Sequence, residues 1–521
     1  MPHNLDPVAL AVFIFLFLLV TVIGFVAGRW RRGDLDMLHE WGLGGRRFGT
    51  WVTWFLVGGD IYTAYTFIAV PALMYGAGST GFFAVPYTIL VFPVLFIVFP
   101  RLWSVARKHG YITSADFARG RYGSGGLALA VAFTGVLATM PYIALQLLGI
   151  QAVLAAMGIN GDWPLVLAFV ILAAYTYQSG LRAPALVAVV KDLLIYVTVI
   201  VMVVYIPIQL GGFGHIFDAA ANVLPNRSTP ATLIPDSGEA FSGYATLALG
   251  SAFALFLYPH ALTGIFSANS GNAIRRNATL LSAYSLALAI IALFGYMAIA
   301  AGLKLTDPNF AVPDLNLKFF PSWFVGFAFS AVAIGALVPA AIMSIAAANL
   351  FTRNVYKEYF RRDISDREEA RVAKLTSLVV KAGALAFILF LPTEYAIDLQ
   401  LLGGVWILQT LPTIMLGLYT RWFHRWALIC GWTVGMVAGT AMTASQAFSS
   451  IFPLSIGGFS FAAYAGLYAL AANLVVAAIL TLVFPALGAT HGEDETSDTD
   501  YLEFGEAAER EQAEPTRGLA R

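Results

Sequence analysis

The feature that most constrains this chain is a succession of thirteen long apolar stretches. Each is long enough to cross the roughly 30 Å hydrocarbon core of a bilayer as a helix rising 1.5 Å per residue. Only 12% of the 521 residues are charged, against about a quarter in a soluble protein. Because a bilayer offers the backbone no hydrogen bonds, such spans must be helical. We therefore predict an all-α polytopic membrane protein with about 13 transmembrane helices, at approximately residues 8–30, 49–75, 82–103, 126–157, 163–181, 185–210, 242–266, 279–303, 321–350, 374–392, 397–420, 426–447 and 459–484.

The basic residues of the short loops predict how the chain crosses the membrane, because cytoplasmic loops carry an excess of Lys and Arg. These residues gather in the loops after the first, third, seventh, ninth and eleventh stretches, whereas the alternate loops hold few. This pattern places the N-terminus outside and the C-terminus inside. The residues are Arg29, Arg31, Arg32, Arg46 and Arg47; Arg107, Lys108, Arg119 and Arg121; Arg275 and Arg276; Arg353, Lys357, Arg361 and Arg362; and Arg421 and Arg425.

The chain divides into a transmembrane domain, residues 1–484, and a short C-terminal tail, residues 485–521. The tail is rich in Asp and Glu and poor in apolar residues, so we expect a disordered cytoplasmic segment. The sequence has no P-loop, no glycine-rich dinucleotide motif and no nucleophile–base arrangement in a soluble segment, which argues against a primary pump and against an enzyme. We expect no cofactor and no nucleic-acid partner.

The second apolar stretch carries an acid near the middle of the bilayer. It reads FLVGGDIYTAYTFIAVPALMYG over residues 55–76, with Asp60 near its centre. A bare carboxylate at this depth costs at least a few kcal/mol, which makes Asp60 a functional candidate. Gly58 and Gly59 favour unwinding and Pro71 cannot donate a backbone hydrogen bond, so we predict a broken helix that turns free N–H and C=O groups toward substrate and ion. The alternative is a kinked helix whose aspartate bonds a neighbouring hydroxyl.

The second to eleventh stretches can form two inverted sets of five, with core repeats at about 49–210 and 242–420. The first helix of each repeat should then be broken. The seventh stretch carries Pro259 beside His260 at its middle, in the position that corresponds to the broken second stretch. Paired interruptions of this kind indicate a binding site at the bilayer midplane.

Several motifs, spread in order over nearly 400 residues, resemble those of the sodium:solute symporter family, which has the leucine-transporter fold. They are GGDIYTA at 58–64, ITSADFARGRYGS at 112–124, YIALQLLG at 142–149, SGLRA at 179–183, FTRNVYKEY at 351–359 and LQTLPTIMLGLY at 408–419. Within the family, the closest resemblance is to bacterial monocarboxylate permeases, which take up lactate, pyruvate and similar short acids. The stretches that carry this narrower resemblance are APALVAVVKD at 183–192 and LYPHALTGIF at 257–266.

The resemblance implies a sodium site between the second and ninth stretches, built from backbone carbonyls of the broken helix and two hydroxyl side chains. The carbonyl positions fall on Gly58, Ile61 and Gly335. The hydroxyl positions fall on Val338 and Pro339, neither of which has a side-chain oxygen. The chain therefore departs from the family pattern where Na⁺ needs ligands.

A second departure lies in the sixth stretch, where the family has a Thr-Asp pair followed three residues later by Gln. The corresponding residues here are Val187, Ala188 and Lys191. Lys191 has two interpretations. Its ammonium reaches the membrane interface, with Asp192 as a local partner, or it takes the place of sodium near the carbonyls of the broken helix. In the second case Lys191 or Asp60 could exchange a proton, so we favour proton coupling, with sodium coupling as the alternative.

A monocarboxylate at the midplane needs hydrogen-bond donors or positive potential. We expect free N–H groups in the second half of the broken helix, around residues 62–65, to supply both, and a neutral Asp60 to donate to the acid. Polar side chains near the breaks are further donors. Each also has a structural alternative: tyrosines can anchor spans at the membrane interface, a histidine can bond a neighbouring carbonyl, and polar side chains can form hydrogen bonds between helices. The substrate-binding candidates are Tyr62, Thr63, Tyr65, Tyr142, Gln146, Pro259, His260 and Gln409.

These features together predict a secondary active symporter of the cytoplasmic membrane that imports short monocarboxylates, such as lactate and pyruvate, with protons. The alternative is a sodium-coupled symporter of another small solute, such as an amino acid or a vitamin acid. A sensor with a permease-like fold is a further alternative, which the lack of an attached kinase domain disfavours. The expected partners are the small-molecule substrate and the lipid bilayer.

Overall fold

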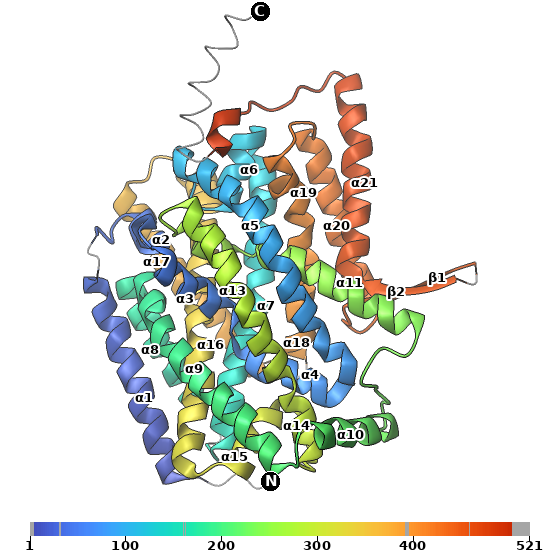
Figure 1. Ribbon diagram of the computed structural model, residues 1–521. Helices are drawn as coiled ribbons and strands as arrows, with labels where there is room; N and C mark the ends of the chain where they lie inside the picture. The colour runs from blue at the N-terminus through green and yellow to red at the C-terminus, as the bar shows by residue number, and fades with distance from the viewer. Residues whose placement is uncertain are drawn as a thin grey trace, which may run out of the picture.

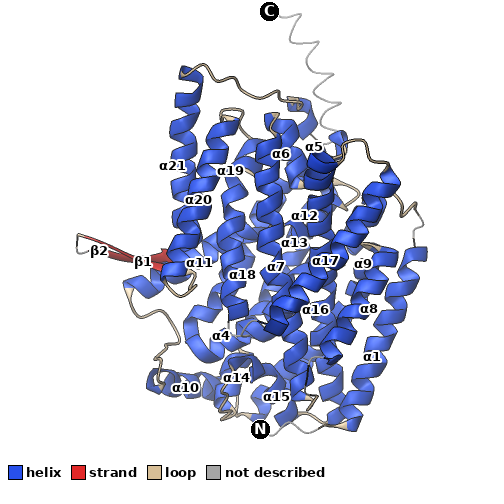
Figure 2. Ribbon diagram, turned by 180° about the vertical axis from the view of Figure 1, so that it is seen from behind, coloured by secondary structure: helices blue, strands red, loops and turns tan. Residues whose placement is uncertain are grey.

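In the computed structural model the chain forms a bundle of helices that stand side by side (Figure 1). The structure describes residues 5–30, 33–159, 161, 163–390, 395–457 and 459–502. Helix α1 (Pro7–Val26) begins at one end of the bundle and α21 (Ala465–Ala486) finishes at the opposite end. Strands β1 (Ile451–Ile456) and β2 (Phe459–Tyr464) form an antiparallel hairpin that projects from the side of the bundle (Figure 2).

Each of the thirteen predicted stretches falls on a helix or on a run of consecutive helices, except that the first six residues of the last one, 459–464, form strand β2. The undivided ones, besides α1 and α21, are α5 (Ala84–His109), α7 (Gly125–Ala156), α8 (Trp163–Ser179), α9 (Arg182–Gln209), α16 (Ser322–Phe351), α17 (Asp366–Phe390) and α20 (Arg425–Ser445). The divided ones are α3 (Thr50–Ile61), η3 (Tyr65–Ala69) and α4 (Val70–Ala77); α11 (Gly238–Leu255) and α12 (Pro259–Phe266); α13 (Gly271–Ala292) and α14 (Phe294–Ala300); and α18 (Tyr395–Ile407), η8 (Leu408–Thr410) and α19 (Leu411–Ile414).

Shorter elements connect these helices. They are η1 (Ala27–Arg29), α2 (Leu38–Leu43), η2 (Gly44–Arg46), η4 (Gly78–Phe83), α6 (Ser114–Tyr122), α10 (Phe213–Val223), η5 (Leu224–Asn226), η6 (Pro308–Phe310), α15 (Ala311–Phe319), η7 (Thr352–Phe360), η9 (Leu416–Leu418) and η10 (Asp498–Tyr501).

The number of membrane crossings is smaller when it is counted by helix length and apolarity alone. Ten helices in the described part of the chain pass this test, or eleven if the bent pair α11 and α12 is one span. Helix α8 falls short because it has only 17 residues. The number thirteen, and the side of the membrane on which each end lies, therefore stay predictions.

Helix α16 lies at the centre of the bundle. Its sequence is apolar on all sides and rich in alanine, as expected of a helix with no face toward water. Residues 328–350 are all buried, and α16 packs against α1, α7, α9, α17 and parts of both broken helices. Its small side chains let these neighbours approach closely, which holds the broken helices against a central support.

The two broken helices run antiparallel, as an inverted pair of repeats requires. Helix α3 starts just after Phe48, and α12 ends just before Ala268. These two residues lie in an isolated bridge, in which the Asn269 N–H donates to the Phe48 carbonyl at 2.9 Å. Pro259 occupies the first turn of α12, where its missing N–H costs nothing, and α11 and α12 bend by 47°. Both breaks therefore lie inside the bundle, side by side.

The position of the first break differs from the prediction. Gly58 and Gly59 are helical residues within α3. The helix ends at Ile61, and Tyr62 has extended backbone angles, φ −87° and ψ 91°. The glycines serve packing instead, as described below, and the chain unwinds at residues 62–63.

The loops predicted to be cytoplasmic meet at one end of the bundle. Direct contacts join four of these five loops, which are up to 302 residues apart in the sequence, and the Phe48–Ala268 bridge brings the loop after the seventh stretch to the same end. The contacts are those of Arg46 with the carbonyls of Ala106 and Tyr111, Arg119 with Glu358, Arg353 with Asp116 at 3.8 Å, Arg121 with the Gly417 carbonyl at 2.9 Å, and Arg425 with the Gly123 carbonyl at 3.2 Å.

The prediction of a disordered tail is wrong for its first part. Residues 489–502 lie across the same basic end and are docked there. Asp494 pairs with buried Arg121 and, at 3.1 Å, with Arg421, while the Glu495 N–H donates to the Gly120 carbonyl at 2.8 Å. Tyr501 is only 5% exposed. Residues 503–521 lie outside the described residues.

Asp500 fastens this docked segment to the end of α5. Its carboxylate lies 2.5 Å from Lys108 Nζ and 2.8 Å from His109 Nε2. Burial alone raises the pKa of the Asp500 carboxyl, but hydrogen bonds from Lys108, the Ser497 backbone and His109 together lower that pKa below its ordinary value. The stabilisation is therefore present above the ordinary pKa of about 4 and is lost as the pH falls through the lower folded-state pKa.

A chain ending at Gly488 should melt about 3 °C or more below the full chain in detergent, because it loses the pairs of Asp494 with Arg121 and Arg421 and the buried Tyr501 side chain. The control is a chain ending at Leu502, which keeps the docked residues that the structure describes and should melt like the full chain. Equal melting temperatures for all three chains would contradict the docking of the segment.

Candidate functional site

Lys191 of α9 lies at the end of α3, where that helix breaks. The side chain is fully buried, and Nζ donates hydrogen bonds to the carbonyls of Gly59, at 2.8 Å, and Tyr62, at 3.0 Å. The last carbonyls of a helix have no partner within the helix, and a cation suits this negative end. The interpretation of Lys191 as an interfacial lysine is therefore wrong, since its ammonium satisfies interior carbonyls.

The contacted carbonyls are one residue further along the chain than the resemblance implied. The carbonyl of Gly58 accepts from the Tyr62 N–H at 2.9 Å, and that of Ile61 accepts from the Thr66 hydroxyl at 3.1 Å. Both predicted carbonyls are thus already paired. The shift follows from the later break, which leaves Gly59 and Tyr62 facing α9.

The α16 positions of the implied sodium site provide no ligand to Lys191. Gly335 is buried against α9, where a Cβ at this position would lie 3.5 Å from Ile195 Cδ1. Its carbonyl is not among the oxygens that Lys191 contacts in the described structure. Val338 and Pro339 are also buried.

A carboxylate and two tyrosines complete the surroundings of Lys191. Asp192 Oδ1 lies 3.1 Å from Lys191 Nζ, and Asp192 Oδ2 accepts a hydrogen bond from the Tyr284 hydroxyl at 2.7 Å. The Tyr62 hydroxyl in turn donates to the backbone carbonyl of Tyr284 on α13. A buried cation needs a paired anion to remain charged. The network supplies one and ties α3, α9 and α13 together.

Gly58 and Gly59 make this close approach possible. A Cβ on Gly59 would lie 3.2 Å from Lys191 Nζ and 3.3 Å from Ala188 Cβ. A Cβ on Gly58 would lie 2.9 Å from the ring of Tyr284. Larger residues would separate α3 from α9 and α13, and the ammonium would lose its carbonyls.

Asp60 and His260 face each other from the two broken helices. Asp60 Oδ2 lies 3.7 Å from His260 Nε2, and the two residues are 4% and 1% exposed. Asp60 Oδ1 and both ring nitrogens of His260 make no hydrogen bond within the described part of the chain. Buried polar atoms are nearly always paired, so this pair marks a place where a proton or a polar ligand can be accommodated.

A narrow cavity of about 30 Å³ lies on the far side of two tyrosine rings from His260, and neither Asp60 nor His260 is among its lining residues. That volume holds one or two water molecules, so a larger solute requires the cavity to widen. The rings of Tyr142 and Tyr258 border His260, with centroids 5.3 and 5.2 Å from the imidazole. Polar lining residues are Tyr65, Tyr87, Tyr142, Ser251, Tyr258, Gln400 and Tyr464.

Of the predicted candidates, Tyr65 and Tyr142 line this cavity. Sequence reasoning missed Tyr87, Tyr258, Gln400 and Tyr464. The only local signal was at Tyr258, which directly precedes Pro259 in the second break.

Gln146 and Thr63 stabilise the unwound segment. Gln146 Oε1 accepts from the Ala64 N–H at 3.0 Å, and Thr63 Oγ1 accepts from the Tyr65 N–H at 3.1 Å. The expectation of free N–H groups around residues 62–65 is therefore wrong for Tyr62, Ala64 and Tyr65, whose amides are occupied. Most backbone donors of this stretch are therefore engaged within the protein.

Gln409 does not line the cavity, contrary to the prediction. Its Nε2 donates to the Val405 carbonyl at 2.9 Å, and its Oε1 accepts from Asn473 of α21 at 3.2 Å. The amide therefore joins α18 and η8 to α21. Gln400, at the start of the same helical run, takes the place at the cavity that was predicted for Gln409.

The profile of the sodium:solute symporter family matches residues 41–439, a range that contains Lys191, Asp60 and His260. The chain belongs to this family. As a sodium:solute symporter it is a multi-pass transporter of the bacterial cytoplasmic membrane and not an enzyme.

Curated relatives cover nearly the whole symporter. It is 57% identical over 487 residues to a Rhizobium johnstonii protein named a monocarboxylate transport permease, an alignment that covers 93% of this chain and 99% of the relative. It is 35% identical over 481 residues to the uncharacterized symporter YodF of Bacillus subtilis, covering 91% and 93% of the two chains.

Solved structures confirm the fold. A Na⁺-coupled sialic acid symporter in its substrate-bound outward-open state superimposes with a TM-score of 0.76 at 15% identity, covering 92% of this chain and 98% of that one. Mhp1, a nucleobase-cation-symport-1 family transporter with bromovinylhydantoin bound, superimposes with a TM-score of 0.51 at 13% identity. This match covers 90% of this chain and 100% of Mhp1. The predicted leucine-transporter fold is confirmed. At these sequence identities, the structural similarity is evidence of the fold alone.

Gly58→Ala should destabilise the symporter by about 1–3 kcal/mol, because the added methyl group overlaps the Tyr284 ring that holds Asp192. Gly214→Ala is the matched control, since a Cβ at this helical position meets no atom within 4 Å. Melting in detergent tests both variants. Gly58→Ala melting no lower than Gly214→Ala would refute the close approach.

Proposed function

We propose that this symporter imports short monocarboxylates such as lactate and pyruvate, and that protons drive the uptake. The substrate class is supported by the relative named a monocarboxylate transport permease, which shares 57% of its aligned residues with this chain over nearly its full length. The tyrosine-lined cavity near His260 offers hydroxyl donors to a short acid, which it can admit only after widening.

The observation that carries the choice of ion is the Lys191 ammonium on the Gly59 and Tyr62 carbonyls. Na⁺ requires several oxygen ligands, and here two carbonyls at the break already bind a fixed cation. The two positions where the resemblance expects hydroxyls are Val338 and Pro339, which have no side-chain oxygen. Because the Lys191 ammonium supplies the positive charge at this site, no Na⁺ is needed there, and the proton is the coupling ion that moves.

The Asp60–His260 pair is the proposed place where proton and substrate meet. An ionised Asp60 would repel a carboxylate, whereas a protonated Asp60 can donate a hydrogen bond to it. His260 and the hydroxyls of Tyr65 and Tyr142 are further donors around the same cavity. Substrate and proton therefore favour each other's binding, as symport requires.

Uptake of labelled lactate into proteoliposomes tests the proposal when a pH gradient and a sodium gradient are imposed separately. We expect uptake driven by the inward proton gradient alone. Protein-free liposomes are the control, because undissociated acid crosses bilayers by itself. Uptake that depends on the sodium gradient alone would contradict proton coupling, and no uptake above the control under either gradient would contradict the substrate class.

Asp60→Asn should reduce proton-driven accumulation to the level of protein-free liposomes while leaving part of lactate exchange intact, because an amide can hydrogen-bond the substrate but cannot release a proton. Asp218→Asn, an exposed substitution on α10, is the matched control and should transport normally. Undiminished accumulation by Asp60→Asn would remove this residue from the coupling mechanism.

A further inference from the structure

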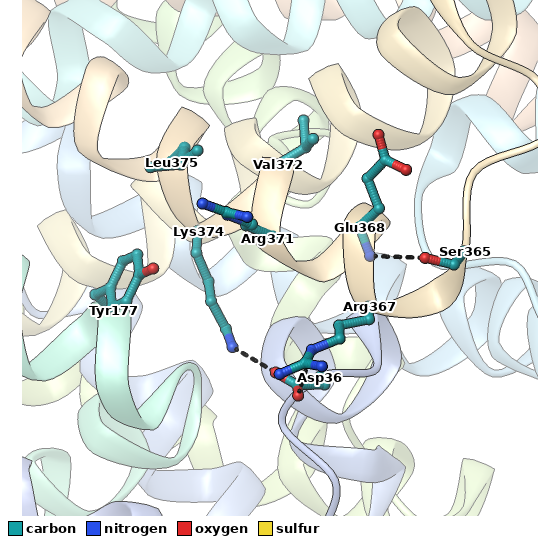
Figure 3. A pocket seen from close by; sticks show the side chains of 9 residues that line it. All are labelled: Asp36, Tyr177, Ser365, Arg367, Glu368, Arg371, Val372, Lys374 and Leu375. Atoms are coloured by element: carbon teal, nitrogen blue, oxygen red, sulfur yellow. Dashed lines mark hydrogen bonds and ion pairs between the residues drawn. The ribbon is translucent and has the colours of Figure 1, made fainter.

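A wide groove lies far from the breaks, at the basic end of the bundle. It is an open groove of about 770 Å³ between the loop before α2, the C-terminal end of α8 and the first turns of α17. Figure 3 shows three cationic side chains of α17 at this groove, Arg367, Arg371 and Lys374. Nothing in the transport site involves them.

The groove holds more positive than negative charge. Asp36 is shared by two of the cations, with its carboxylate 3.3 Å from Arg367 Nε and 3.5 Å from Lys374 Nζ. Glu368 pairs outward with Arg361 at 2.6 Å. Arg371 is exposed, and its guanidinium has no contact in Figure 3 with the other residues drawn there. One carboxylate therefore faces three cations in this groove, and the excess positive charge attracts anions.

An apolar strip continues from Arg371 along the same face of α17. Residues four apart on a helix lie one above the other, so Leu375 and Val379 follow Arg371 in a line. Leu375 is 48% and Val379 70% exposed. Helix α17 is one of the spans that can cross a membrane, so this exposed strip lies where lipid chains run. A cationic head followed by an apolar strip is complementary to an amphiphile with an anionic head.

We propose that this groove binds an anionic phospholipid, with its phosphate against Arg371 and Lys374 and an acyl chain along Leu375 and Val379. A soluble anion would match the arginine but would leave the apolar strip without a role, so the observations favour the lipid. Basic pockets at the cytoplasmic ends of membrane helices commonly bind such headgroups. The lipid would hold the start of α17 against α8 and the loop before α2.

Lipid binding to the full chain in detergent, measured by native mass spectrometry and by thermal melting, tests this site. The probes are phosphatidylglycerol, phosphatidylcholine with the same acyl chains, and glycerol phosphate as a headgroup without chains. We expect phosphatidylglycerol to bind more tightly and to raise the melting temperature more than either other probe. Arg371→Gln should weaken phosphatidylglycerol binding about fivefold, the effect of one surface charge on an anionic lipid.

The matched control is Arg276→Gln, which removes another exposed arginine at the same end of the bundle and should bind phosphatidylglycerol like the unmodified chain. Equal binding of the two phospholipids would overturn the proposal. Undiminished phosphatidylglycerol binding by Arg371→Gln would also overturn it. Equal stabilisation by glycerol phosphate would show that the groove takes a free anion and not a lipid.

Discussion

The contact between the Lys191 ammonium and two carbonyls at the end of α3 is the interaction on which the rest of the site depends. A helix that ends inside a bundle leaves carbonyls without partners, and burying them unpaired is costly. Lys191 satisfies them, but a buried ammonium requires an anion, which Asp192 provides. Tyr284 then holds that carboxylate from α13. Each member of the network meets a requirement created by the one before it.

The same break also presents Asp60 to the second broken helix. Successive helical residues point in different directions, so the Gly59 carbonyl can face α9 while the Asp60 side chain faces His260. A change in the backbone at residues 62–63 would therefore alter the Lys191 contacts and the surroundings of Asp60 together. This shared backbone is a physical route by which the fixed cation, the proton and the substrate can be linked.

Much of this site could be predicted from the sequence because charged residues are rare in apolar spans. Asp60 was recognised for that reason, whereas Lys191 followed from the family resemblance and His260 from its place beside Pro259 in the second break. The exact break was misplaced because glycine permits both unwinding and close packing, and here Gly58 and Gly59 serve packing. Because the break comes later, Lys191 contacts the carbonyls of Gly59 and Tyr62, each one residue after the carbonyl that the resemblance implied.

Other errors have a tertiary origin. The acidic tail was predicted to be disordered from its own composition, but its partners, among them Arg121 and Arg421, are in distant loops. Gln409 and Gln400 are equally polar, and the sequence does not show that Asn473 of α21 holds Gln409 away from the cavity that Gln400 lines. The cavity tyrosines come from four separate elements and the link between α11 and α12, and aromatic residues in apolar helices are more often ordinary core.

The central claim is that Lys191 makes sodium unnecessary, and proton movement tests it most directly. Lactate would be added to weakly buffered proteoliposomes in sodium-free medium while the external pH is followed. The account predicts alkalinisation above that of protein-free liposomes for the unmodified symporter, and none above that level for Lys191→Met, which removes the ammonium at similar volume. Alkalinisation that appears only when sodium is added, or that persists fully in Lys191→Met, would contradict it.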